Sequence, residues 1–148
     1  MSQSNAGVSP KARNSVAKPL VRPLSPHLQI WRFHTTMLGS ILSRAAGIGL
    51  YVGAIIVVAW IATLTIGGEA YESFLAVAGS PVGLLVWFLL TAGAFYHLAA
   101  GIRHLIWDLG YGLSPRTATT LTNLTLWFGV LATIGFWVAL FATGKVQL

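Results

Sequence analysis

The stretch YHLAAGIRHLIWD, residues 96–108, places two histidines, an arginine and an aspartate at the end of a long apolar run. Positions i, i+4, i+7 and i+11 of an α-helix share one stripe, and here they are His97, Gly101, His104 and Asp108. Ionisable groups at membrane depth cost free energy, and they persist where they have a partner or a function. We therefore expect one helix face to carry the polar chemistry in the middle of this protein.

The composition is that of a membrane protein. Of the 148 residues, 55% are hydrophobic and 8% are charged, whereas a soluble domain is about 25% charged. The formal net charge is +6, but the basic residues gather before the first apolar segment, where they flank a membrane span. No nucleic-acid partner is therefore expected. The absence of cysteine excludes disulfides, thiolate-ligated iron–sulfur clusters and covalently attached c-type heme within the chain.

Three apolar segments predict an all-α membrane protein with three transmembrane helices, at residues 37–66, 81–107 and 121–143. Each segment is long enough to cross about 30 Å of hydrocarbon. The connections at 67–80 and 108–120 are predicted as loops. Basic residues concentrate in the N-terminal tail and near the second loop, so the positive-inside rule predicts a cytoplasmic N-terminus and a C-terminus on the other side of the membrane.

The region before the first span divides into two parts. Residues 1–21 are polar and contain two prolines, which predicts a disordered cytoplasmic tail. Residues 22–38 include Trp31 and Arg32, and aromatic rings and cations both suit the headgroup layer. This second part is predicted to be an interfacial segment. From these residues alone, a simple anchor and a docking surface for a partner are equally open.

His97 is the sharpest candidate ligand. It lies about ten residues from the end of the second span, roughly 15 Å deep at 1.5 Å per residue. A neutral imidazole is a good axial ligand for heme iron, and an interhelical hydrogen bond is the alternative. His104, on the same helix, cannot supply the opposite face of the same heme. Together with Arg103 or Arg44 it would suit a heme propionate, because cations pair with carboxylates.

A second polar pair lies on the first span. Arg44 is about two turns inside that span, and Ser40 is one turn earlier on the same face. An arginine at this depth snorkels, pairs with an acid or donates to a ligand oxygen. The two side chains can hydrogen-bond a carbonyl oxygen on a flat apolar ligand, and a quinone headgroup meets that description. Snorkelling, with Ser40 as a helix-packing residue, is the alternative.

Three blocks of the sequence then resemble one known family. They are RPLSPHLQIW at 22–31, SILSRAAG at 40–47 and HLAAGIRHLIWD at 97–108. In this order, and on the predicted helices, they resemble the cytochrome b556 subunits of succinate dehydrogenase, the larger membrane anchors of respiratory complex II. The resemblance extends from residue 22 to about residue 143. Three blocks in register are far more specific than one histidine in an apolar span.

The resemblance implies that His97 is one axial ligand of a heme b, with the second histidine supplied by a small membrane anchor subunit. It also implies that Arg44, Arg103 and His104 lie on the heme propionate side. One position departs from the family pattern, because Ser43 stands where the family often has a histidine that interacts with a propionate. We expect this change to weaken the heme contacts modestly without removing a ligand.

The resemblance further implies that Ser40 and Arg44 help to bind ubiquinone, and that residues 22–38 dock on an iron–sulfur subunit. The complex would be a succinate:ubiquinone oxidoreductase that links the tricarboxylic acid cycle to the respiratory chain. A flavoprotein subunit would oxidise succinate, because this chain has no flavin or dinucleotide motif. The location would be the bacterial cytoplasmic membrane, or the mitochondrial inner membrane in a eukaryote. A fumarate reductase anchor and a non-redox membrane scaffold are the alternatives.

Overall fold

The computed structural model describes residues 30–144, and the helices that follow one another there are α2 (Thr35–Ile66), α3 (Gly68–Ala78), α4 (Pro81–Asp108) and α5 (Pro115–Ala142). Within these residues, three helices are long and apolar enough to cross a membrane, namely α2, α4 and α5. This agrees with the predicted all-α membrane protein. The predicted tail, and residues 22–29 of the predicted interfacial segment, lie outside the described residues.

The N-termini of α4 and α5 are set by the same local device. The Ser80 side chain accepts a hydrogen bond from the Gly83 N–H at 3.1 Å, and a proline occupies the first turn. Ser114 does the same for α5, accepting from the Thr117 N–H at 3.3 Å. A Ser cap followed by proline is a strong helix start, because the proline ring presets φ and lacks an N–H that would go unpaired.

This cap corrects the predicted start of the third span. The helix begins at Pro115, whereas the apolar pattern predicted a start at residue 121. The residues between are polar and rich in threonine, so hydropathy assigned them to the loop. Their hydroxyls are accommodated within the helix, since Thr119 and Thr120 donate to the carbonyl oxygens four residues earlier at 2.9 and 3.1 Å.

The first predicted loop also contains a helix. Gly67 ends α2 with a φ of 73°, and its N–H donates to the Thr63 carbonyl oxygen at 2.9 Å. The chain then turns into α3, which carries Glu69 in its first turn, where a negative charge suits the helix dipole. The prediction of a loop at 67–80 was therefore wrong for residues 68–78. Gly67 and Gly68 favoured a loop in the sequence analysis, but they precede and begin a short helix that joins α2 to α4.

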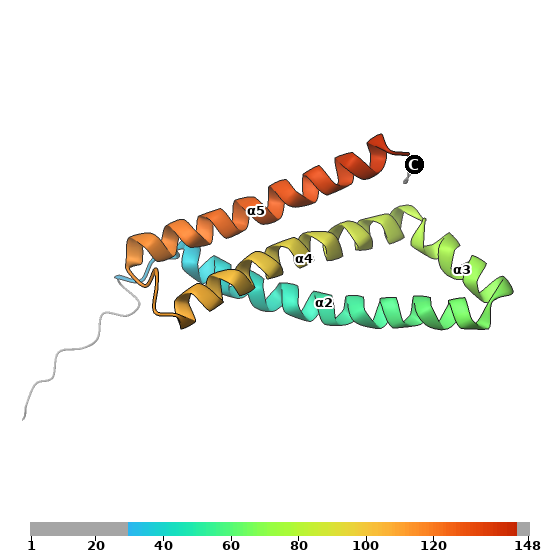
Figure 1. The fold of residues 1–148 in the computed structure, drawn as a ribbon, viewed down its shortest axis with the longest axis horizontal. Helices are drawn as coiled ribbons and strands as arrows, with labels where there is room; N and C mark the ends of the chain where they lie inside the picture. The colour runs from blue at the N-terminus through green and yellow to red at the C-terminus, as the bar shows by residue number, and fades with distance from the viewer. Residues whose placement is uncertain (1–29, 145–148) are drawn as a thin grey trace, which may run out of the picture. The chain divides into compact units, whose positions relative to one another are not determined.

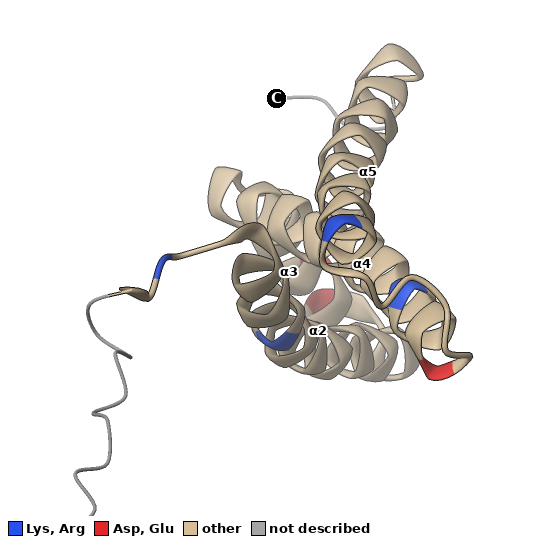
Figure 2. Cartoon of the chain, turned by 90° about the vertical axis from the view of Figure 1, so that its left-hand side faces the viewer, with Lys and Arg blue, Asp and Glu red and all other residues tan. Residues whose placement is uncertain are grey.

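Helix α4 is the central element, and it packs on both α2 and α5 (Figure 1). The ends that meet are the start of α2, the end of α4 and the start of α5. Figure 2 looks onto this end of the helices. By their positions in α2, α4 and α5, Arg44, Arg103 and Arg116 lie nearer this end, whereas Glu69 and Glu72 lie on α3, which joins the other ends of α2 and α4. Figure 2 shows blue segments on α2, α4 and α5.

Close approach of the helices depends on small or internally bonded residues. A Cβ on Gly53 of α2 would lie 2.7 Å from Leu90 Cδ2 of α4, so a larger residue there would force the Leu90 side chain to shift. The buried stripe of α5 consists of Thr122, Thr125, Gly129, Thr133 and Trp137. Its threonines donate to carbonyl oxygens four residues earlier, at 2.6 to 2.8 Å. The hydroxyls are thereby satisfied inside a dry interface, as helix packing in lipid requires.

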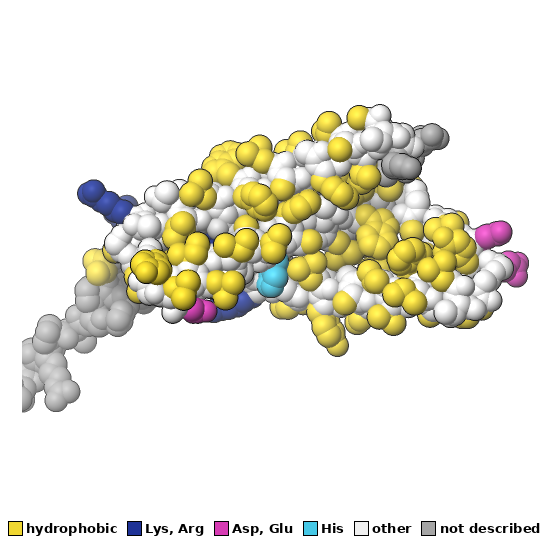
Figure 3. Space-filling model, in the orientation of Figure 1, with side chains coloured by type: hydrophobic (Ala, Val, Ile, Leu, Met, Phe, Trp, Pro, Cys, Tyr) yellow, Lys and Arg dark blue, Asp and Glu magenta, His cyan; other side chains and the backbone are white. Residues whose placement is uncertain are grey.

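The outward surface of these helices is hydrophobic. Leu89 of α4 and Leu131 of α5 are 59% and 62% exposed, while the buried hydrophobic residues in the described part are only Tyr96, Ala100 and Trp137. Figure 3 shows hydrophobic side chains over most of one face. A surface of this kind is stable against lipid tails or against another membrane protein, not against water.

Candidate functional site

His97 projects from α4 at the edge of the contact with α2. Its Nδ1 lies 3.3 Å from the backbone carbonyl oxygen of Ser43, so the tautomer with a proton on Nδ1 donates to that oxygen. The imidazole also packs over Gly47, where a Cβ would lie 3.3 Å from its Cε1. The side chain is otherwise exposed. Helix α2 therefore orients the ring, and in this tautomer Nε2 keeps its lone pair.

This arrangement fits an axial ligand of heme. Protein ligands of this type commonly donate their second ring N–H to a carbonyl oxygen, which sets the tautomer and the ring orientation. Among the described residues, no group of three His, Cys, Asp or Glu side chains could hold a metal ion by itself. An iron bound at His97 would therefore need ligands other than a cluster of such side chains in this part of the chain.

The predicted polar stripe on α4 is present, and Arg103 is not part of it. His97, His104 and Asp108 are all exposed, and the ring of His104 lies 5.6 Å from that of Trp107. Arg103 is only 3% exposed, and its guanidinium lies 4.9 Å from the centre of the Trp107 ring. Six residues of helix rotate Arg103 about 120° away from His97. The structure therefore brings His97 and His104 to one face and places Arg103 inside the bundle.

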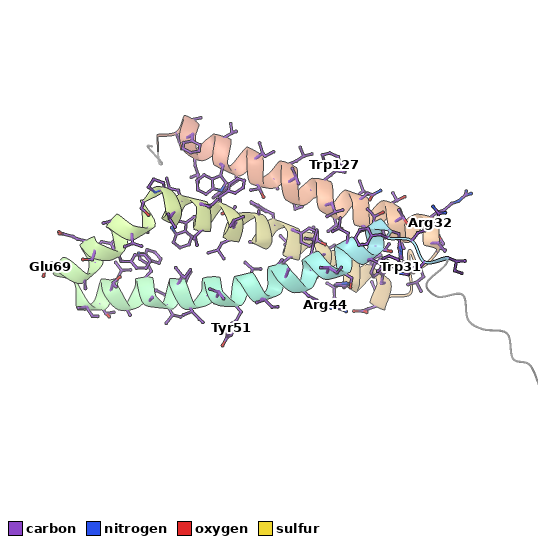
Figure 4. All side chains as sticks on the ribbon, turned by 180° about the vertical axis from the view of Figure 1, so that it is seen from behind. Trp31, Arg32, Arg44, Tyr51, Glu69 and Trp127 are labelled. Carbon is purple, nitrogen blue, oxygen red and sulfur yellow. The ribbon has the colours of Figure 1, made fainter. Side chains whose placement is uncertain are left out.

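Ser40 and Arg44 lie one turn apart on α2, as the sequence indicated. Ser40 is half-buried and Arg44 is exposed, and Figure 4 shows Arg44 extending outward from α2. Among the described residues no salt bridge involves Arg44, so its guanidinium has no carboxylate partner there. Figure 3 shows a basic side chain, a histidine and an acidic side chain close together within a hydrophobic surface. This is the small polar region where the helices offer donors to a ligand.

Tyr96 is a site residue that the sequence reasoning left without a role. It is 8% exposed, and its hydroxyl donates to the Gly39 carbonyl oxygen at 2.7 Å. The sequence did contain a signal, because a tyrosine deep in an apolar helix needs a partner for its hydroxyl. It lies directly before His97. Helix α4 thus contacts α2 through two consecutive polar side chains.

A separate cavity of about 440 Å³ opens between α2, α4 and α5. Its lining is apolar and includes Ala46, Gly93 and Gly129. The polar groups that reach it, Tyr96 and Thr133, are already committed to carbonyl oxygens. This cavity offers no free donor to a quinone or a propionate, so the candidate site is the exposed region around His97, Ser40 and Arg44.

Comparison with known proteins matches residues 18–136 to a family described as the succinate dehydrogenase/fumarate reductase transmembrane subunit. The chain is 36% identical over 121 residues to the succinate dehydrogenase cytochrome b556 subunit of Rickettsia conorii, which covers 79% of this chain and 91% of the relative. The corresponding subunit of Paracoccus denitrificans is 35% identical over 97 residues, covering 66% and 75%. The mitochondrial cytochrome b560 subunit of Sus scrofa is 35% identical over 119 residues, covering 77% and 69%.

Proposed function

We propose a function for this chain on the basis of its family. The chain belongs to the succinate dehydrogenase and fumarate reductase transmembrane subunits. It is the cytochrome b membrane anchor of a succinate dehydrogenase complex. Beyond that, we infer that it provides one ligand to a shared heme b and two donors to a ubiquinone site. The observation that supports this most directly is the orientation of His97 by the Ser43 carbonyl oxygen.

In the proposed heme site, His97 would hold the iron through Nε2, while its Nδ1 donates to the Ser43 carbonyl oxygen. A heme b held there would accept and release single electrons. The small membrane anchor subunit supplies the second histidine and covers the exposed face of α4. Arg44 and His104 then lie on the propionate side, where a cation pairs with a carboxylate. Arg103 is buried within this chain, and its Nε and Nη1 have no hydrogen-bond partner among the described residues, so a propionate would have to reach it between the helices.

In the proposed quinone site, the Ser40 hydroxyl and the Arg44 guanidinium donate to a carbonyl oxygen of ubiquinone. Negative charge grows on that oxygen during reduction, so donors held in place beforehand stabilise the reduced forms most. Removing water from the site strengthens both hydrogen bonds. Among the described residues the Arg44 guanidinium has no carboxylate partner and Ser40 is half-buried one turn away, so both side chains are available as donors to one carbonyl oxygen.

The proposed complex has four subunits. The flavoprotein subunit oxidises succinate, and the iron–sulfur subunit passes electrons to the quinone site. Residues 22–38 dock on the iron–sulfur subunit. The N-terminus lies in the cytoplasm, as the positive-inside rule predicts from the basic residues that precede the first span. Relatives from Rickettsia and Paracoccus favour the bacterial cytoplasmic membrane as the location. The family description also includes fumarate reductase, so an anchor of that enzyme is the second candidate.

A reduced-minus-oxidised optical spectrum of the purified complex tests the heme proposal. The wild-type complex should show a b-type band, and His97→Ala should abolish it. His104→Ala is the comparison variant, since it removes a propionate-side histidine from the same exposed stripe but no iron ligand, and it should weaken or shift the band without abolishing it. A complex without any heme band would support a non-redox scaffold. An unchanged band in His97→Ala would refute the ligand assignment.

A further inference from the structure

Two neighbouring residues of α4 hold two neighbouring turns of α2. The Tyr96 hydroxyl donates to the Gly39 carbonyl oxygen at 2.7 Å, and His97 Nδ1 lies 3.3 Å from the Ser43 carbonyl oxygen. Gly39 and Ser43 are four residues apart, so their carbonyl groups lie one turn apart along the same edge of α2. The register between the two helices is therefore specified by a pair of directional contacts.

These carbonyl groups belong to the peptide units that precede the proposed quinone-site residues. The Gly39 carbonyl lies in the peptide that continues into Ser40, and the Ser43 carbonyl lies in the peptide that continues into Arg44. Holding a peptide unit fixes the start of the next residue's side chain, because the unit is planar and rigid. Each hydrogen bond thus positions one proposed quinone donor relative to His97.

Tyr96 is much more closely confined than His97. On α5, a Cβ at Gly129 would lie 3.0 Å from the Tyr96 Cβ and 3.2 Å from its Cα. On α2, a Cβ at Gly39 would lie 3.6 Å from the tyrosine hydroxyl. Gly129 therefore lets α5 approach the Tyr96 backbone closely, while on α2 the tyrosine hydroxyl donates to the Gly39 carbonyl oxygen. A side chain held in this way can set the position of α2 rather than adapt to it.

We propose that Tyr96 is a positioning residue for quinone reduction. Through the Gly39 carbonyl it holds Ser40 in register with His97, so that the quinone donors and the heme ligand keep a constant spacing. This inference rests on the proposed function, because it takes Ser40 as a quinone donor. It adds a residue that does not contact the quinone itself.

The test is Tyr96→Phe in the complete complex, which removes one hydroxyl and keeps the ring that fills the bundle. Loss of one neutral hydrogen bond should raise the KM for ubiquinone about fivefold. The heme band and succinate oxidation with an artificial acceptor should stay at wild-type values. Tyr51→Phe is the matched control, since Tyr51 also lies within a span but is 72% exposed, and its KM should not change.

A double-mutant cycle separates positioning from a general structural role. If Tyr96 acts through Ser40, adding Tyr96→Phe to Ser40→Ala should raise the KM no further, because coupled residues are not additive. If the increases in KM caused by Tyr96→Phe and Ser40→Ala multiply in the double variant, the positioning role is overturned. It is also overturned if Ser40→Ala raises the KM and Tyr96→Phe leaves it at the wild-type value. By contrast, wild-type KM values in both Ser40→Ala and Arg44→Ala would show that the proposed quinone site itself is wrong.

Discussion

The two halves of α4 bind their neighbours in different ways. In the half that ends at Asp108, contact with α2 is made by Tyr96 and His97, which reach carbonyl oxygens at 2.7 and 3.3 Å. In the half that begins at Pro81, contacts are apolar. Gly53 of α2 receives the Leu90 side chain, and the Phe88 ring lies 5.7 Å from that of Trp137 on α5.

This difference has a physical meaning in lipid. Between helices surrounded by acyl chains there is little hydrophobic driving force, so association depends on close packing and on hydrogen bonds. Close packing alone tolerates small rotations of a helix, whereas a hydrogen bond between two fixed partners does not. The apolar half thus supplies contact area, and the polar half specifies the orientation on which a ligand site depends.

The largest expected effect is that of Arg44→Ala. Arg44 follows Ser43 in the part of α2 that contacts the polar half of α4. Loss of a charged donor should lower kcat/KM for ubiquinone by about tenfold to a hundredfold, since hydrogen bonds from charged groups contribute about 1.5–3 kcal/mol. Succinate oxidation with an artificial acceptor should persist. Arg116→Ala removes the same charge from the exposed start of α5 and should have little effect. Equal losses in the two variants would mean that net charge, not the position of Arg44, matters.

A smaller effect is expected from Gly39→Ala, which tests how tightly the polar half is packed. The added Cβ would lie 2.6 Å from the Thr122 Cγ2 on α5 and 3.1 Å from Arg103 Nη1. Such overpacking costs about 1–3 kcal/mol, which should lower the thermal midpoint of the complex and raise the KM for ubiquinone.

Thr122→Ser offers a direct rescue of that variant. It deletes the Cγ2 and keeps the hydroxyl that donates to the Ala118 carbonyl oxygen at 2.8 Å. The double variant Gly39→Ala, Thr122→Ser should therefore recover most of the lost stability. If it recovers none, the contact between the starts of α2 and α5 is not what limits the size of residue 39.

The smallest effect is predicted for Phe95→Leu, at the boundary between the two halves of α4. The Phe95 ring lies 6.5 Å from Phe128 and 5.9 Å from Phe136, both with edge geometry. Their loss should cost about 1 kcal/mol, seen as a slightly lower thermal midpoint. The heme band and the KM for ubiquinone should not change. A raised KM would show that apolar packing also sets the quinone site, which would remove the distinction between the halves.

The sequence predicted the three spans well because long apolar segments are a property of consecutive residues. It missed α3 because that helix follows two glycines and carries two glutamates, and it missed the first turns of α5 because they are polar and follow a serine cap, none of which hydropathy records. The three resembling blocks also identified the family, since a motif such as HLAAGIRHLIWD is read along one chain. All of this information is local and needs no knowledge of which helix packs on which.

Only the tertiary structure decided which polar residues face each other. In the sequence Arg103 and His104 are neighbours with equal claims to a propionate, yet one is buried beside Trp107 and the other is exposed. Likewise, Ser43 looked like the loss of a heme contact, while its backbone carbonyl is the acceptor for His97. Every residue has a backbone carbonyl, so the sequence does not indicate which one accepts a hydrogen bond from His97. The packing of α4 on α2 determines that partner.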